Sequence, residues 1–379
     1  MATEPTEHQL EQSKPSSTAQ KSTITIGTRR SQLARLQTDI VVAALQAAHP
    51  EHTYKIHAMD PLGDRDKTTA LYQFNAKSLW TSELEALLSA GTLDLIVHSL
   101  KDMPTTLPAG LALGAVPARE DPRDALVLPL GADAAQPAAA GSADAVFAAL
   151  PPGSVVGTSS QRRAAQLRAR YPHLRFRDAR GNVPTRLRKL DHAERPDGFR
   201  DADDERREGE AEAEGPVYAA LILAAAGLIR LGLGDRITAY LSSEDGGMLH
   251  AVGQGAIGVE VREGDEKMAA LLKGLSDDKT EQACWAERSV MRTLEGGCSV
   301  PVGVETEWSS EDELRMKAVV VSLDGSETIN ADVKMAVRSK DDADEFGRHV
   351  AKMLIDRGAG KILDAITLNR KTLAEQNNA

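Results

Sequence analysis

Short apolar segments alternate with helical periodicity through the first part of the chain. Ser22–Gly27, Tyr54–Met59 and Leu93–Val97 are predicted strands, and Ser31–His49 and Leu79–Leu88 are predicted helices between them. Strand–helix–strand alternation of this kind is typical of a parallel α/β sheet, because parallel strands need long crossover connections. We therefore predict an α/β unit here.

A second series of the same kind follows. Strands are predicted at Ser154–Gly157, Leu174–Arg177 and Ala219–Leu223, and helices at Gln161–Tyr171 and Val183–Asp191. This pattern predicts a second α/β unit.

The remaining segments differ in character. An Ala-, Gly- and Pro-rich stretch, Pro129–Ser142, is a predicted surface loop, and Ala256–Val261 is a further buried strand. Beyond it we predict a smaller α+β unit, with elements at Glu281–Leu294 (helix), Met316–Ser322 and Ile329–Val337 (antiparallel strands) and Ala343–Arg357 (helix).

The charge is distributed unevenly. The chain has a net charge of −11, which argues against a general nucleic-acid or membrane-surface binder, yet residues 162–189 hold nine arginines and one lysine against Asp178 alone. A solvated helix face explains Arg168 and Arg170. The arginines that follow predicted strands favour a polyanionic ligand instead, because ligands of α/β sheets bind at the carboxyl ends of strands and guanidinium pairs with carboxylates. Only 3% of residues are aromatic, so base stacking on this patch is the weaker alternative.

Three shorter motifs carry reactive residue types. Val97–Pro104 places a histidine, a serine, a lysine and an aspartate after a buried strand; a capped turn is the alternative explanation. Leu294–Pro301 sets Cys298 behind two glycines, which permit close approach of a bulky group to a nucleophile or attachment point, whereas a buried cysteine is the alternative. Gly27–Ser31 joins a strand end to a helix and suits an anion.

With only Cys284 and Cys298, the chain has neither a disulfide scaffold nor a multi-cysteine metal site, and we expect no metal. Cys284 fits a buried helical position. The polar residues 1–21 are predicted to be a disordered tail, and the longest apolar stretch, Tyr218–Ile229, is too short to cross a bilayer. We expect a cytoplasmic protein that binds neither membranes nor nucleic acid.

Taken together, the motifs resemble the porphobilinogen deaminase family, also called hydroxymethylbilane synthases. The resemblance extends from about Thr23 to Gly303, and seven segments carry it in order: Ile26–Ala34, His98–Thr105, Val156–Ala164, Arg180–Arg186, Ala226–Arg230, Val252–Gly258 and Leu294–Pro301. Seven motifs in the right order are far more specific than any one of them.

The resemblance implies an α/β fold class, with two periplasmic-binding-protein-like α/β domains and a small C-terminal α+β domain. The expected division is 22–117 with 256–275 for domain 1, 118–255 for domain 2, and 276–379 for domain 3. It also implies a transferase, mostly monomeric, that condenses four porphobilinogen molecules head to tail into 1-hydroxymethylbilane and releases four ammonia molecules in tetrapyrrole (haem) biosynthesis.

The same resemblance implies a dipyrromethane cofactor held by a thioether to Cys298, with Asp102 as catalytic acid and as the stabiliser of the cationic azafulvene left when ammonia departs. Each pyrrole carries two carboxylates, so an arginine-rich cleft is the expected counter-charge. The positions that match the family's cofactor and substrate binders are Arg29, Ser31, Ser99, Lys101, Thr158, Ser159, Ser160, Arg162, Arg163, Arg180, Arg186, Arg230 and Gln254. Arg30, Arg175, Arg177 and Arg188 are interpreted as structural or solvated.

Two segments depart from the family pattern. The acidic run 192–216 stands where the family has a short turn and is predicted to be a disordered insertion. Met59–Lys77 resembles the mobile lid of the family but differs at Asp60–Leu62. A non-enzymatic binder of a carboxylate-rich molecule remains the alternative function, although it would need neither Asp102 nor Cys298.

Overall fold

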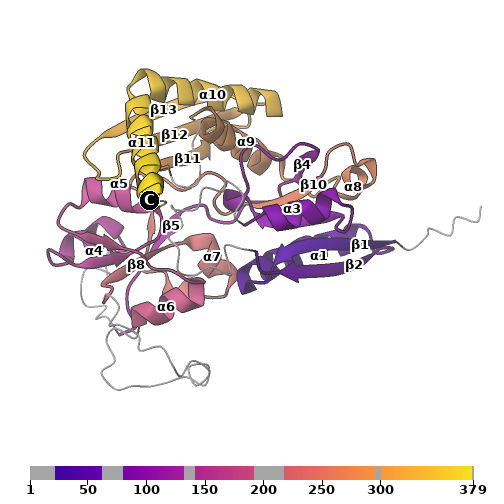
Figure 1. Ribbon diagram of the computed structural model, residues 1–379, viewed down its shortest axis with the longest axis horizontal. Helices are drawn as coiled ribbons and strands as arrows, with labels where there is room; N and C mark the ends of the chain where they lie inside the picture. Colours follow the sequence, from indigo (N-terminus) through magenta and orange to yellow (C-terminus); the bar gives the residue numbers. More distant parts are fainter. Residues whose placement is uncertain (1–21, 62–79, 132–140, 192–216, 295–299, 378–379) are drawn as a thin grey trace, which may run out of the picture.

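The computed structural model describes residues 22–61, 80–131, 141–191, 217–294 and 300–377, with side chains described as far as 368. Three sheets, each with its own helices, make up this part of the chain (Figure 1). The expected tail 1–21, the acidic insertion 192–216, most of the expected lid 59–77 and the central part of the predicted loop Pro129–Ser142 lie outside the described residues.

The first sheet has the strand order β2-β1-β3-β10-β4. Its strands are β1 (Thr23–Arg29), β2 (Thr53–Met59), β3 (Leu95–Ser99), β4 (Leu111–Ala115) and β10 (Ile257–Arg262), and its helices are α1 (Gln32–Ala48), α3 (Ser82–Ser89) and α8 (Glu266–Leu271). β1 pairs in parallel with β2 and β3, as the sequence predicts, whereas β10 runs antiparallel to both β3 and β4. The sheet is therefore mixed and not purely parallel.

The second sheet repeats this plan with the order β7-β6-β8-β5-β9. Its strands are β5 (Asp124–Val127), β6 (Val155–Gly157), β7 (Arg175–Arg177), β8 (Ala220–Ala224) and β9 (Ala239–Leu241), and its helices are α4 (Ala143–Ala149), α5 (Gln161–Arg170), α6 (Val183–Asp191) and α7 (Ala225–Arg230). Here β5 is the antiparallel strand. It follows the segment in which the chain crosses from the first sheet to the second, and β10 follows the segment in which the chain crosses back. Each sheet thus receives one strand directly from a crossing segment, which ties the two together.

The third sheet is antiparallel, with β11 (Val302–Trp308), β12 (Glu313–Val321) and β13 (Thr328–Ala336) in sequence order. Helices α9 (Asp278–Thr293), α10 (Lys340–Asp356) and α11 (Ala359–Asn377) pack with it, and Phe346, Val350 and Val304 lie in the shared core. The sequence predicts β12, β13, α9 and α10 but misses β11 and α11, as well as β4, β5, β9, α4, α7 and α8. The missed strands are short or follow glycine and proline, so their alternation is hard to see in the sequence.

The predicted α/β fold class is confirmed: two α/β parts, each built on a mixed five-stranded sheet, and a small α+β part. In both large sheets the parallel strands place their carboxyl ends, and the turns that follow them, at one edge.

Candidate active site

Asp102 lies in the turn that follows β3. The turn Leu100–Asp102 is a single 3₁₀ turn that ends before Pro104, so the carboxylate is held just beyond the strand end. Arg29, the last residue of the neighbouring parallel strand β1, brings its Nη1 to 3.7 Å from Asp102 Oδ2. The Asp102 side chain is 34% exposed, so it can meet a ligand and a guanidinium at the same time.

Trp80 supports Arg29 from the other side. The guanidinium carbon of Arg29 lies 4.4 Å from the centre of the Trp80 ring, in a cation–π contact. The sequence did not single out this tryptophan, and nothing in its spacing indicates the contact.

Lys101 is buried between the first two sheets. Its Nζ donates to Gln254 Oε1 over 3.4 Å. Burial lowers the pKa of Lys101 to about 8, an effect that Asp102 opposes and Arg163 reinforces. An ammonium group in these surroundings is stabilised by a bound anion.

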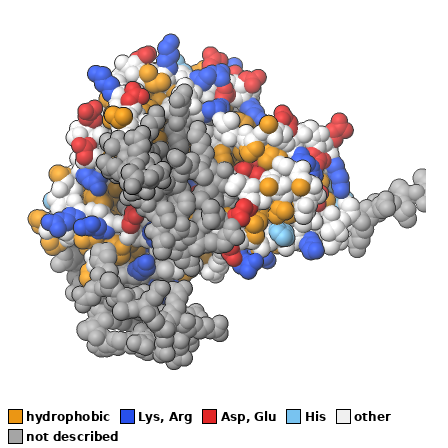
Figure 2. Space-filling model, viewed as in Figure 1, with side chains coloured by type: hydrophobic (Ala, Val, Ile, Leu, Met, Phe, Trp, Pro, Cys, Tyr) orange, Lys and Arg blue, Asp and Glu red, His pale blue; other side chains and the backbone are white. Residues whose placement is uncertain are grey.

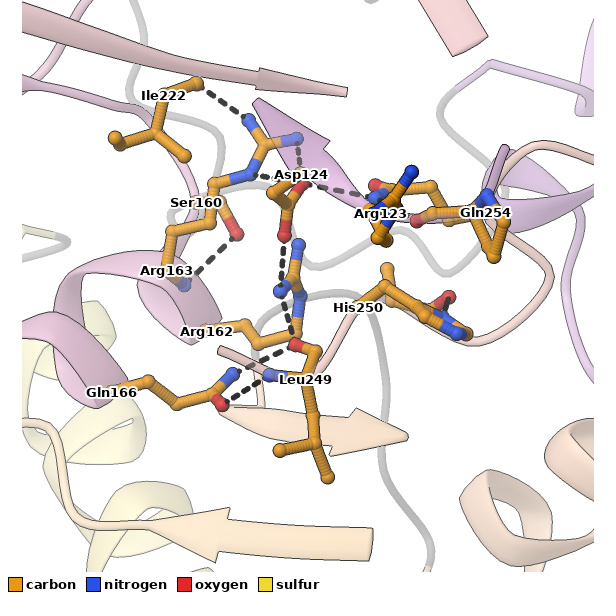
Figure 3. A network of polar contacts seen from close by, with 12 residues as sticks. Arg123, Asp124, Ser160, Arg162, Arg163, Gln166, Ile222, Leu249, His250 and Gln254 are labelled. Atoms are coloured by element: carbon orange, nitrogen blue, oxygen red, sulfur yellow. Dashed lines mark hydrogen bonds and ion pairs between the residues drawn. The ribbon is translucent and has the colours of Figure 1, made fainter. Parts of the chain in front are cut away.

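Asp124 is a buried carboxylate between two arginines of α5 (Figure 3). Arg162 Nη1 lies 2.7 Å from its Oδ2 and Arg163 Nη2 lies 2.7 Å from its Oδ1. Burial alone raises the pKa of Asp124, but Arg162 and Arg163 outweigh that effect and hold the pKa well below its usual range. Gln254 Nε2 also donates to Asp124 Oδ1, so the cluster reaches Lys101 through one amide side chain.

Arg162 and Arg163 therefore meet protein groups, although the sequence suggested that they bind ligand. Their residues are 5% and 6% exposed, and they also donate to the carbonyls of Leu249 and Ile222. Sequence reasoning missed Asp124 because it lies far from both arginines along the chain.

The other predicted arginines lie nearer the surface or the passage between the sheets. Arg186, on α6, donates through Nε to Gly181 O over 2.7 Å. Burial, followed by the charges of Arg163 and Arg180, lowers the pKa of Arg186 to about 10. Arg230 donates to Gly255 O over 2.8 Å, and burial lowers its pKa as well.

Thr158, Ser159 and Ser160 form the turn between β6 and α5. Thr158 Oγ1 accepts from the Ser160 amide and Ser160 Oγ accepts from the Arg163 amide, which caps α5. The turn borders a cavity of about 90 Å³ that Gln161, Arg168 and Arg177 also line. Its hydroxyl and guanidinium groups suit a carboxylate. Arg177, interpreted from sequence as structural or solvated, is part of this lining.

Two predicted serines have structural partners. Ser31 caps α1 by accepting from the Ala34 amide over 3.4 Å, and Ser99 Oγ donates to Gln37 Oε1 over 2.9 Å. Gln37 was not predicted. Both serines nevertheless follow or end strands of the first sheet, beside Arg29 and Asp102.

Cys298 lies outside the described residues, between the end of α9 and Val300, which packs against the core of the third sheet. Cys284, in contrast, is fully buried on α9, as predicted, and burial raises its pKa to about 12. Among the described residues, no group of His, Cys, Asp and Glu side chains could hold a metal ion. Nor is any described helix long and apolar enough to span a bilayer.

Residues 24–270 match the family model described as porphobilinogen deaminase, dipyromethane cofactor binding domain, and residues 281–356 match the C-terminal domain of the same enzyme. The chain belongs to the porphobilinogen deaminase family. A relative in Neurospora crassa, named porphobilinogen deaminase, is 49% identical over 353 residues, which cover 93% of this chain and 96% of the relative. Those of Yarrowia lipolytica (49% identical, covering 90% and 93%) and Saccharomyces cerevisiae (43%, covering 92% and 98%) carry the same name.

In this member of the porphobilinogen deaminase family, residues from both large sheets meet near the segment that holds Gln254. Lys101 and Asp102 come from the first sheet, and Arg163, Asp124 and Arg186 come from the second. Gln254, in the segment that crosses between these sheets, bonds to both Lys101 and Asp124 and so links the two sets.

Proposed function

We propose that this chain is a hydroxymethylbilane synthase, a transferase that joins four porphobilinogen molecules head to tail and releases four ammonia molecules. The observation that carries the proposal is the Asp102 carboxylate, partly exposed and 3.7 Å from Arg29, among buried cations of both large sheets. Family membership gives the substrate, and this geometry gives the chemistry.

Asp102 is the proposed catalytic acid. It protonates the departing amine of the substrate, and its carboxylate then faces the cation that remains on that pyrrole. Arg29 lies beside the Asp102 carboxylate, and Trp80 limits the orientations open to Arg29. In this proposal one side chain both donates the proton and stabilises the cation.

The residues present fit a dipyrromethane with its four carboxylates. Two cations, Lys101 and Arg186, have pKa values that desolvation lowers to about 8 and about 10, so each is stabilised by an anion brought close to it. Lys101, Ser99, Arg180, Arg186 and the turn Thr158–Ser160 are the proposed holders, with Cys298 as the thioether attachment point. When bound, the dipyrromethane supplies the pyrrole carbon to which the first substrate is joined.

Arg29, Ser31 and Arg230 are the proposed binders of substrate carboxylates, since they lie toward the carboxyl ends of the first sheet or the crossing segment. For Arg162 and Arg163 we propose a mainly supporting part. Their ion pairs with Asp124 fix the start of α5, and Gln254 carries this restraint to Lys101.

We also propose the domain division 22–117 with 256–275, 118–255 and 276–379. The three sheets and the two segments that cross between the large sheets support it.

A monomeric, cytoplasmic protein that does not bind nucleic acid is proposed as well. On the face shown in Figure 2, acidic and basic side chains are interspersed over the described surface, in keeping with the net charge of −11. Gel filtration with light scattering tests the monomer, and gel shift with single-stranded RNA tests the last point. A dimer mass or an RNA shift at physiological salt would contradict them.

The deciding experiment is the intact mass of the purified protein before and after addition of porphobilinogen. We expect an adduct of two deaminated pyrrole units that maps to Cys298 and grows by further units with substrate. Cys298→Ala should fold and carry no adduct, while Cys284→Ala, the matched control, should keep it. An unmodified wild-type mass in both conditions would contradict the proposed function.

A further inference from the structure

Three ionisable side chains are buried together under the Asp102 turn. His98 lies on β3, Glu260 on β10 and Glu85 on α3, and they are 5%, 0% and 4% exposed. Around them the same face of the sheet is apolar, with Ile96, Leu84 and Leu88 in one core cluster. Burying such groups costs stability unless they satisfy one another, so their grouping calls for a role.

His98 and Glu260 connect neighbouring strands. In the antiparallel pairing His98 lies opposite Gly258, so Glu260, two residues further along β10, is its diagonal neighbour on the same face. His98 Nε2 and Glu260 Oε2 are 2.9 Å apart. A carboxylate can only accept, so Nε2 carries the proton of this bond. The bond joins β3 to β10 one residue before Ser99.

Glu85 approaches the pair from α3. Burial raises the pKa of Glu85, the Thr81 hydroxyl lowers it, the Glu260 carboxylate raises it and His98 lowers it, with a net increase. Oε1 of Glu85 and Oε1 of Glu260 are both buried without a hydrogen-bond partner among the described residues. A proton on Glu85 removes one of two buried like charges.

Two arginines complete the charged surroundings. Arg288 of α9 acts on Glu260 through its charge but donates to the carbonyls of Met103 and Pro104. Arg262 of β10 donates to the carbonyls of Leu88 and Leu93, at the far end of α3. The side-chain hydrogen bonds of Arg288 go to main-chain carbonyls, whereas Arg262 also donates to the Asp265 carboxylate over 2.7 Å.

Each of the three elements that hold the cluster also delivers part of the active site. β3 leads directly into Lys101 and Asp102. α3 begins just after Trp80, the residue that stacks on Arg29, and the Glu85 amide donates to Thr81 O. β10 follows Gln254, and the Leu100 amide donates to Ala256 O over 3.0 Å.

We propose that His98, Glu260 and Glu85 form a positioning cluster that sets Asp102 against Arg29. The inference rests on the proposed function of Asp102. None of the three side chains touches the reacting atoms; they act by fixing the strand end and the helix start that carry them. A buried polar bond does this more specifically than apolar packing, because it has one geometry.

The test compares Glu260→Gln with Glu85→Gln in the purified holoenzyme. Glu260→Gln replaces the carboxylate that accepts from His98 with a neutral amide and weakens this bond, and we expect kcat to fall about 10- to 100-fold with KM little changed, as expected for misplacement of a catalytic group. Its pH profile of kcat should shift, and Glu260→Asp should recover part of the loss. Glu85→Gln keeps a neutral donor in place and should retain kcat within about threefold.

Unfolding temperatures across pH give a readout that does not need turnover. Because the pKa of Glu85 is raised in the folded state, its contribution to stability is present below the unfolded pKa and is lost as pH rises through the folded value. Glu85→Gln should therefore gain stability relative to the wild type as pH rises above the unfolded pKa of a glutamate, about 4.3. Asp265→Asn, which weakens the cap of α8 and the ion pair with Arg262 but leaves His98, Glu260 and Glu85 in place, is the control for general destabilisation of the first sheet.

The proposal is overturned if Glu260→Gln merely unfolds earlier, as Asp265→Asn does, with kcat and its pH profile unchanged. A stability difference for Glu85→Gln that stays flat across pH overturns the raised pKa of Glu85. If Glu260→Gln does not fold, His98→Gln is measured in the same way. Loss of turnover in the wild type itself would contradict the proposed function, while the unfolding data would still report on Glu85.

Discussion

The two large sheets share one strand order, but the aspartates at their strand ends differ in exposure and in the number of arginines they meet. In the first, Asp102 is 34% exposed and faces Arg29 at 3.7 Å. In the second, Asp124 is fully buried between Arg162 and Arg163, both at 2.7 Å. The strand order is the same around both residues. Solvent access and the number of cationic partners therefore distinguish an aspartate that a ligand can reach from one that only stabilises the fold.

The sharpest test of this contrast is Asp102→Asn. We expect turnover of porphobilinogen to fall about 100- to 10,000-fold, the range for loss of a general acid or base. The unfolding temperature should stay near that of the wild type, because the side chain is partly exposed and makes one long ion pair. Ehrlich colour and product absorbance measure the rate.

Asp60→Asn is its matched control, since Asp60 also faces an arginine at the end of β1, Arg30, at 3.4 Å. It should keep wild-type turnover. If it loses as much activity as Asp102→Asn, proximity to the cationic strand end matters more than the position of Asp102.

Asp124→Asn tests whether the buried aspartate stabilises the fold. It leaves two buried guanidiniums without their carboxylate, so the free energy of unfolding should fall by about 3–5 kcal/mol. Urea titration followed by circular dichroism measures this. Asp121→Asn, which removes an ion pair to the partly exposed Arg123, should cost no more than about 1 kcal/mol. Equal losses would mean that the Asp124 cluster is not a structural centre.

Lys101 should give a smaller, pH-dependent effect. Its pKa of about 8 in the ligand-free chain means that its positive charge is present below that pH and is lost above it. In a Cys298→Ala background, affinity for a carboxylate-bearing dipyrromethane analogue should therefore weaken several-fold as pH rises past about 8, and Lys101→Arg should abolish the decline. Calorimetric titration at several pH values measures it. A flat profile in the Cys298→Ala protein with Lys101 intact would show that Lys101 does not bind the anion.

The smallest effect is expected from deletion of residues 193–214. The acidic run lies between α6 and β8, and Asp191, which must be kept, pairs with Arg236 at 2.8 Å. Turnover and unfolding temperature should stay within about twofold and a few degrees, as is common for surface insertions. Loss of soluble protein would show that the run is part of the fold.

The elements that the sequence predicted best are those with long, clear periodicity. α6 is found at Val183–Asp191 as predicted, and α1, α5, β2 and β6 agree to within a residue or so at most ends. The direction of β10 was not predictable, because an apolar run has the same pattern whether its neighbour is parallel or antiparallel. β11 and α11 were missed altogether.

The candidate site shows the same division. The motif around Asp102 indicated its place at a strand end, and the structure places Arg29 beside it. The arginines of α5 were interpreted as ligand binders because a guanidinium that meets a ligand and one that meets a buried carboxylate leave the same trace in sequence. Asp124, Trp80 and Gln37 gave no local signal, since their partners are distant along the chain.

The sequence by itself determined the α/β character of the chain, the excess of cations in residues 162–189 and its family, because these depend on local patterning and on motifs in order. Only the tertiary structure decided which of these cations pair with carboxylates of the protein, as Arg162 and Arg163 do with Asp124. It also placed His98, Glu260 and Glu85 in one buried cluster. Both outcomes depend on contacts between segments far apart in sequence, and the burial that sets their electrostatics exists only once the sheets have packed.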